Sequence, residues 1–153
     1  VGSLVLFFSL PNISGIYDPY IVFSFLSLIW ISDSAAYVVG VTFGKRPLFK
    51  SVSPKKSIEG FLGGLIFSII LSLMFYKYLN LNLNLLEWVI LGGLTSCLGT
   101  LGDLVQSQFK REAGVKDSGK WLPGHGGLYD RMDSIIFAAP FIYLSLIIFK
   151  NVS

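Results

Sequence analysis

The chain has few charged residues: Asp, Glu, Lys and Arg make up 14% of its 153 residues, against about 25% in a soluble globular domain. This scarcity excludes a disordered or nucleic-acid-binding tail, because such segments need high net charge and little apolar content. The single cysteine, Cys97, excludes an intrachain disulfide and a Cys-based zinc site, and it says nothing of redox compartment. With 53% hydrophobic residues, the composition is not that of an ordinary soluble domain.

Four apolar stretches approach the roughly 20 residues that cross a bilayer as a helix. They cover residues 20–44, 58–79, 86–105 and 134–149. Residues 1–10 are also apolar but span only about half the hydrocarbon thickness, and no basic n-region or cleavage site marks them as a signal peptide. We interpret them as the end of a truncated span. The sequence therefore predicts an all-α fold, a single polytopic membrane domain over 1–153 with about four full spans and a partial N-terminal one.

Basic residues indicate the orientation of these spans, since cytoplasmic loops are enriched in Lys and Arg. Segments 45–57 and 107–131 together hold ten of the twelve basic residues. Two spans separate the segments, so both must emerge on the same face. The Asn-rich residues 80–84 form a loop on the opposite face. We predict an integral multi-pass membrane protein whose polar loops face the cytoplasm.

Two acidic residues fall within or at the end of apolar spans, where charge is costly and indicates a functional site or a structural pair. Asp33 shares a helical face with Ala36, Gly40 and Gly44, beside two serines that make a wet cavity plausible. Asp103 ends the third predicted span, on a face with small residues at Gly99 and Thr95. Tight helix packing is the alternative interpretation for both acids.

The loop after the first full span contains a candidate anion site. Ser53 as N-cap and Pro54 as first helical residue predict a helix start, whose free N–H groups attract anions. Lys55 and Lys56 add positive charge there, which favours phosphate. An anchor for lipid head groups is the alternative.

Segment 103–133 is the richest in polar chemistry. Asp130 and Asp133 are three residues apart, so a helix places both carboxylates on one face. Oxygen ligands without clustered Cys or His favour a hard cation such as Mg²⁺, and acids beside basic residues are typical of phosphoryl transfer. The backbone of the Gly-rich run 123–127 either approaches phosphates closely or forms a plain turn. Within this run, His125 is either a hydrogen-bond partner of a substrate or an ordinary loop residue.

The spacing of these residues resembles the signature of the phosphatidate cytidylyltransferases, also called CDP-diacylglycerol synthases. The longest match runs from Ser107-x-x-Lys110-Arg111 through Lys116-Asp117-x-Gly119 to Pro123-Gly124-His125-Gly126-Gly127-x-x-Asp130-Arg131-x-Asp133. Two further stretches, 33–45 and 53–60, resemble the same family. The family has additional N-terminal spans, so the chain is similar to its C-terminal catalytic half.

The resemblance implies transfer of a cytidylyl group from CTP to phosphatidate with Mg²⁺, in a multi-pass membrane protein that is usually a dimer. It implies Asp103, Asp130 and Asp133 as metal ligands, and Asp117 and Lys116 as further catalytic residues, with a second cation in reach. The implied substrate-binding residues are Ser53, Lys55, Lys56, Ser107, Lys110, Arg111, His125, Arg131 and, deeper in the membrane, Asp33.

Two other functions remain open from the residues alone. A CTP-dependent lipid kinase would also use CTP and a lipid acceptor, but it would form a lipid phosphate and CDP. A cation transporter would use the intramembrane acids Asp33 and Asp103 as an ion pathway, yet it leaves the acidic and basic loop at 107–133 unexplained.

Overall fold

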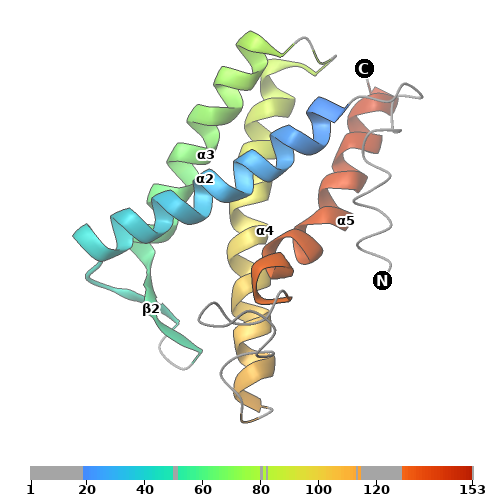
Figure 1. Ribbon diagram of the computed structural model, residues 1–153. Coiled ribbons are helices and arrows are strands. Elements are labelled where there is room, and N and C mark those ends of the chain that lie inside the picture. Colours follow the sequence, from blue (N-terminus) through green and yellow to red (C-terminus); the bar gives the residue numbers. More distant parts are fainter. Residues whose placement is uncertain are drawn as a thin grey trace.

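The computed structural model describes residues 19–49, 52–79, 81, 83–112, 114 and 129–152, and of these it describes 54, 55, 129–133 and 150–152 by backbone only. In this part of the chain the order is α2 (Pro19–Phe43), β1 (Pro47–Phe49), β2 (Ser53–Ser57), α3 (Ile58–Tyr78), α4 (Leu85–Glu112) and α5 (Tyr129–Val152). Figure 1 shows the helices side by side, with the strands at one end of the bundle.

The helices fall on the predicted apolar stretches. Three of them, α2, α3 and α4, are long and apolar enough to cross a membrane, and α5 contains a shorter apolar stretch, Ser134–Phe149. Helix α4 continues to Glu112, beyond the predicted end of its span at Val105, so Asp103 lies inside a helix. The residues after Asp103 are polar but are good helix formers, and the helix therefore extends past its apolar part.

The predicted helix start at Ser53 is wrong, because residues Ser53–Ser57 form strand β2. This strand pairs antiparallel with β1, Pro47 opposite Ser57 and Phe49 opposite Ser53. The N-cap of α3 is Ser57, whose side chain accepts a hydrogen bond from the Gly60 amide at 3.1 Å. The all-α prediction thus misses one short hairpin (Figure 1).

Helices α2 and α3 approach each other closely through small residues. A Cβ atom on Gly60 would lie 2.7 Å from the Ala36 carbonyl oxygen, and one on Gly64 would lie 2.7 Å from the Ser32 carbonyl oxygen. Ser32 also donates a hydrogen bond to Ser96 of α4 at 2.8 Å. Small residues and hydroxyl bridges are the usual means of joining membrane helices, which gain little from hydrophobic contact in lipid.

A second stripe of small residues joins α4 to α3. Ser68 of α3 donates a hydrogen bond to the Gly92 carbonyl oxygen at 2.9 Å, and a Cβ on Gly92 would lie 2.8 Å from Ser72 Oγ. Small residues on both helices therefore allow α3 and α4 to pack closely here.

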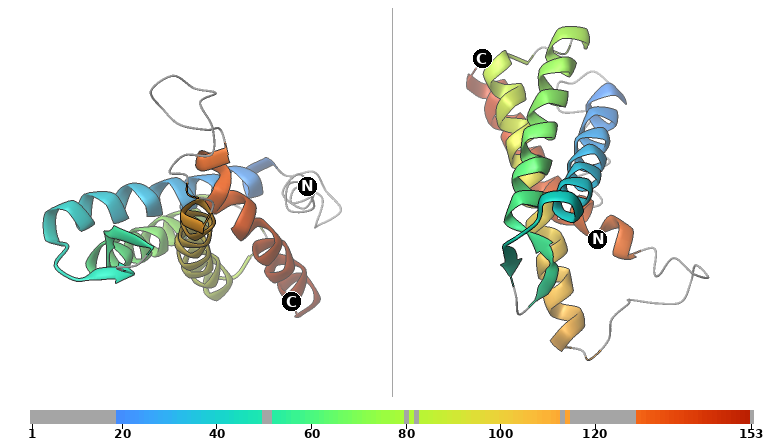
Figure 2. Two further views of the ribbon diagram at one scale, coloured as in Figure 1. Left: turned by 90° about the horizontal axis from the view of Figure 1, so that it is seen from below. Right: turned by 90° about the vertical axis from the view of Figure 1, so that its left-hand side faces the viewer.

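The buried apolar core lies where α2, α4 and α5 meet. It includes Phe25 and Ile29 of α2, Leu91 of α4 and Ala138 of α5. Helix α5 contains Pro140 and is bent (Figure 2), because proline removes an intrahelical hydrogen bond and crowds the preceding turn.

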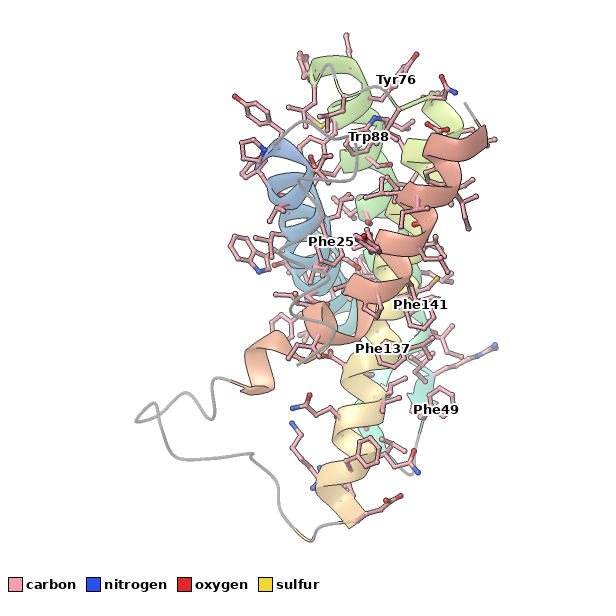
Figure 3. The ribbon with its side chains drawn as sticks, turned by 90° about the vertical axis from the view of Figure 1, so that its right-hand side faces the viewer. Phe25, Phe49, Tyr76, Trp88, Phe137 and Phe141 are labelled. Atoms are coloured by element: carbon pink, nitrogen blue, oxygen red, sulfur yellow. The ribbon has the colours of Figure 1, made fainter. Side chains whose placement is uncertain are left out.

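The hairpin and the C-terminal end of α4 lie at the same end of the bundle, and the connection from α3 to α4 lies at the other (Figures 1 and 2). The described parts of the two basic segments are therefore close together, as their spacing predicts. Figure 3 shows Tyr76 and Trp88 near the far end and Phe49 near the hairpin end. Trp88 is buried, and its ring lies against that of Phe75 of α3, with centroids 5.8 Å apart.

Candidate active site

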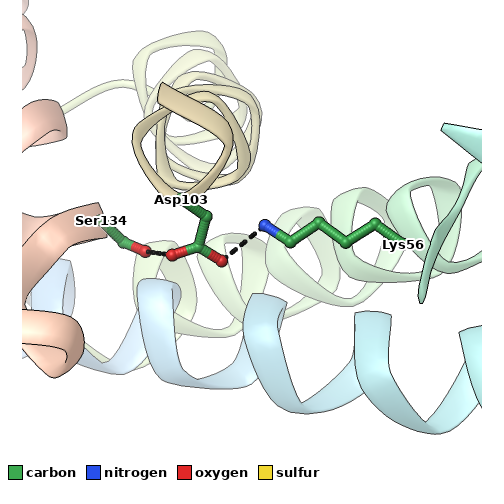
Figure 4. A network of polar contacts seen from close by, with 3 residues as sticks. All are labelled: Lys56, Asp103 and Ser134. Carbon is green, nitrogen blue, oxygen red and sulfur yellow. Dashed lines mark hydrogen bonds and ion pairs between the residues drawn. The ribbon is translucent and has the colours of Figure 1, made fainter. Parts of the chain in front are cut away.

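Three segments that are distant in sequence meet at the carboxylate of Asp103 on α4. The Lys56 ammonium lies 2.6 Å from Asp103 Oδ2, and Ser134 Oγ of α5 donates a hydrogen bond to Asp103 Oδ1 at 2.9 Å. Figure 4 shows the three side chains in a row, with Asp103 in the middle. The Asp103 and Lys56 side chains are each 29% exposed, whereas Ser134 is buried. The site is thus open on one side and closed by α5 on another.

The hairpin that carries Lys56 is fixed by the first turn of α3. Glu59 Oε2 accepts hydrogen bonds from the backbone amides of Lys45 at 3.1 Å and Arg46 at 3.2 Å. The Ile58 amide donates to the Arg46 carbonyl oxygen at 2.9 Å. These bonds hold both ends of the hairpin against the first turn of α3, and so they fix the position of the Lys56 backbone.

Helix α4 presents Asp103 on a face that continues toward its C-terminal end. Ser107 and Lys110 follow Asp103 by four and seven residues, so they share its helix face, and both are half-buried, whereas Arg111 is exposed. One turn before Asp103, a Cβ on Gly99 would lie 3.8 Å from the Ser134 Cβ. The small face predicted around Asp103 therefore admits α5 beside it.

Asp33 of α2 belongs to the same electrostatic environment. Its charge interacts with those of Asp103 and Lys56, and its side chain is exposed. Within the described part of the chain its carboxylate has no hydrogen-bond partner. A negative group so placed increases the negative potential around Lys56.

The other predicted residues are less completely placed. Ser53 is half-buried in β2, and Lys55 of the same strand is described by backbone only. Asp130, Arg131 and Asp133 belong to the first turns of α5 and are also described by backbone only. The remaining three predicted residues, Lys116, Asp117 and His125, lie outside the described residues.

Sequence analysis did not single out Ser134, which the structure places in contact with Asp103. The spacing of the sequence could have identified it: Ser134 follows the predicted metal ligand Asp130 by four residues in helix α5, and residues four apart lie on the same face of a helix. The contact brings the backbone carrying Asp130 and Asp133 close to Asp103, so the two acidic segments of the sequence converge.

The oxygen atoms at Asp103 are of the type that binds a hard cation: the Asp103 carboxylate and the Ser134 hydroxyl are both oxygen ligands. Among the described residues, no group of three or more His, Cys, Asp or Glu side chains could hold a metal ion. The predicted ligands Asp130 and Asp133 belong to the turn of α5 that precedes Ser134, where the structure describes the backbone only.

Comparison with known proteins matches residues 3–149 to the model of the cytidylyltransferase family. A phosphatidate cytidylyltransferase of Staphylococcus aureus (strain COL) is 44% identical over 149 residues, which cover 96% of this chain and 55% of that protein. Proteins of the same name from Staphylococcus haemolyticus, 43% identical over 147 residues, and Staphylococcus saprophyticus, 47% identical over 128 residues, are also similar. The chain spans about half the length of these relatives.

Proposed function

The chain belongs to the cytidylyltransferase family, and from this premise we propose that it is the catalytic membrane domain of a nucleotidyltransferase that transfers a cytidylyl group from CTP to phosphatidate. The products are CDP-diacylglycerol, a precursor in phospholipid biosynthesis, and pyrophosphate. The observation that carries the proposal is the meeting of Lys56, Asp103 and Ser134. It brings the resembling stretch 53–60 to the two residues that flank the longest match, 107–133, at one polar site.

The chemistry requires two highly charged anions to meet. A phosphate oxygen of phosphatidate attacks the α-phosphorus of CTP in line, a new P–O bond forms, and the bond to pyrophosphate breaks. The attacking oxygen is already ionised, so a strong base is unnecessary. Neutralising charge and positioning the two phosphates are the main requirements, and pre-arranged cations at a site with limited access to water meet them.

The basic residues are assigned to the phosphates. Lys110 and Arg111 lie on the last turn of α4, and Lys116 and Arg131 are assigned to the same role by resemblance. Arg side chains suit phosphate because their guanidinium groups donate paired hydrogen bonds.

The hairpin forms the opposite wall of the proposed site. Lys56 reaches Asp103 from it, and Ser53 and Lys55 belong to the same strand. Ser107, His125 and Asp33 complete the proposed substrate-binding set. The Ser107 hydroxyl and the His125 imidazole can donate or accept hydrogen bonds, and the Asp33 carboxylate accepts them.

Mg²⁺ is the proposed cofactor: Asp103, Asp130 and Asp133 would hold it, and Asp117 would support a second cation. When bound, the metal supplies positive charge that stabilises the charge developing on the phosphates. Ser134 holds the Asp103 carboxylate in place by its hydrogen bond to Oδ1.

The site must receive one substrate from water and one from the membrane. We assign the hairpin end to the cytoplasm, because ten of the twelve basic residues lie in the segments assigned to that end. CTP then enters from the cytoplasm, and phosphatidate enters sideways with its acyl chains in the leaflet. The homodimer usual in the family is part of the proposal, and light scattering of the purified protein in detergent would test it.

The function is tested by incubating radiolabelled CTP with phosphatidate and Mg²⁺ in detergent. The assay compares this chain, the chain extended to the length of its relatives, and Asp130→Asn in the extended chain. The matched control is Glu112→Gln, which makes the same change of charge at an exposed residue at the end of α4. We expect CDP-diacylglycerol and pyrophosphate from the extended chain and the control, and a loss of at least about 100-fold in Asp130→Asn.

The products also separate the alternatives. A lipid phosphate with CDP would identify a CTP-dependent lipid kinase. Cation flux into vesicles without CTP turnover would identify a transporter. Wild-type turnover in folded Asp130→Asn would contradict the metal assignment.

A further inference from the structure

We propose that Lys56 acts as an internal cation that occupies the Asp103 carboxylate until a divalent metal displaces it, and that displacement makes its ammonium available to substrate phosphate. The inference rests on the proposed function, since it assigns an order of events to the same site. It concerns the regulation of metal binding, a property that the roles assigned above do not include.

The geometry puts the ammonium where a metal ion would bind. Lys56 Nζ lies 2.6 Å from Asp103 Oδ2, while Oδ1 accepts the hydrogen bond from Ser134. Both carboxylate oxygens are therefore engaged. Mg²⁺ binds oxygen at about 2.0–2.1 Å, so an ion on Oδ2 would stand beside the ammonium, and two positive charges at such a distance repel each other strongly. Metal and ammonium must compete for this oxygen.

The displaced side chain has somewhere to go. Lys56 is the penultimate residue of β2, its side chain is partly exposed, and a lysine stem is long and flexible. Its ammonium also interacts electrostatically with Asp33, whose carboxylate has no hydrogen-bond partner among the described residues. Asp33 is therefore a second carboxylate that attracts the ammonium after it leaves Asp103.

The exchange links two binding events. In the metal-free protein Asp103 and Lys56 neutralise each other, so the Lys56 ammonium is not available to phosphate. Metal on Asp103 releases the ammonium, and by thermodynamic reciprocity a phosphate that captures the ammonium favours metal binding. Metal and substrate then bind cooperatively.

The first test measures Mn²⁺ affinity by electron paramagnetic resonance in the extended chain, without nucleotide or lipid substrate. Lys56→Met removes the competitor, so we expect Mn²⁺ to bind at least about fivefold more tightly, the lower end of typical coupling between sites. Lys56→Arg retains a competing cation and keeps the weaker affinity. Lys45→Met is the matched control: it removes an exposed lysine near the same hairpin and changes affinity by less than about twofold. Unchanged affinity in Lys56→Met, or equal tightening in Lys45→Met, overturns the proposal.

The second test needs no change at Lys56. An amine-acylating reagent with mass spectrometry reads the reactivity of each lysine with and without Mg²⁺. We expect Mg²⁺ to raise the reactivity of Lys56 and to leave that of Lys45 unchanged, and we expect Asp103→Asn to make Lys56 reactive without metal. Lys56 reactivity that does not respond to Mg²⁺ in the wild-type protein overturns the exchange.

Neither test includes CTP or phosphatidate, so the two proposals fail separately. Metal-dependent exposure of Lys56 in a protein that makes no CDP-lipid would overturn the proposed function and leave the exchange standing. Synthesis of CDP-diacylglycerol with unresponsive Lys56 would do the reverse.

Discussion

Gly64→Ala should separate α2 from α3 and lower the stability of the bundle. The added Cβ would lie 2.7 Å from the Ser32 carbonyl oxygen and 3.1 Å from the Ala36 Cβ. A backbone oxygen cannot rotate away as a side chain can, so one helix must shift. Ser32 also holds α4 through its hydrogen bond to Ser96, and the shift therefore strains a second helix contact.

The magnitude follows from two opposing effects. Overpacking of a well-packed interface costs about 1–3 kcal/mol, and the backbone clash puts this site at the upper end. Alanine gains about 1 kcal/mol over glycine in helix propensity. The net loss is about 2 kcal/mol, which corresponds to a fall in Tm of about 4–8 °C for a chain of this size.

Thermal unfolding in detergent, followed by tryptophan fluorescence, measures the effect. Gly93→Ala is the matched control, because it makes the same change within a helix and a Cβ there meets nothing within 4 Å. Its Tm should equal or exceed that of the wild type. A Gly64→Ala protein as stable as Gly93→Ala would refute the close-packing argument.

Two further predictions concern single hydroxyl groups. Ser134→Ala removes the hydrogen bond to Asp103 and should lower kcat/KM for CTP roughly tenfold, since a bond to a charged group is worth about 1.5–3 kcal/mol. Ser145→Ala is the control in the same helix: its hydroxyl donates to the Ile142 carbonyl oxygen of its own helix, and its kcat/KM should stay within about twofold of the wild type. Equal kinetics in both variants would contradict the role of Ser134. Thr95→Val removes a buried hydroxyl without a hydrogen-bond partner in the described structure and should raise Tm by about 2 °C or more. The control Thr42→Val removes an exposed hydroxyl that bonds within α2, and it should not raise Tm. A lower Tm for Thr95→Val would indicate that the hydroxyl has a partner such as bound water.

The helices could be predicted from sequence because a sufficiently long apolar segment forms a helix in a membrane whatever its tertiary contacts. A helix satisfies all of its own backbone hydrogen bonds, so a long apolar segment has little choice in a membrane. The boundaries were less predictable: α4 extends to Glu112 because polar residues such as Gln106 and Lys110 are also good helix formers. Apolar length marks where a membrane span ends, and it does not mark where a helix ends.

The hairpin shows where local pattern failed. Ser53-Pro54 is a typical helix start, yet the residues pair with β1 and the helix begins after Ser57. Backbone hydrogen bonds to β1 and from Lys45 and Arg46 to Glu59 outweigh the local preference. The bonds to Glu59 join residues 14 and 13 positions apart, whereas a capping rule considers only the next three.

The sequence by itself determined the apolar helices, the grouping of basic residues at one end and, through motif spacing, the resemblance to a cytidylyltransferase. These depend on composition and on distances along the chain. Only the tertiary structure decided that Lys56 pairs with Asp103, that Ser134 completes the contact and that Asp33 shares their electrostatic environment. The physical reason is that Lys56 and Asp103 are 47 residues apart, and only the close packing of small residues between helices brings such distant side chains within hydrogen-bond range.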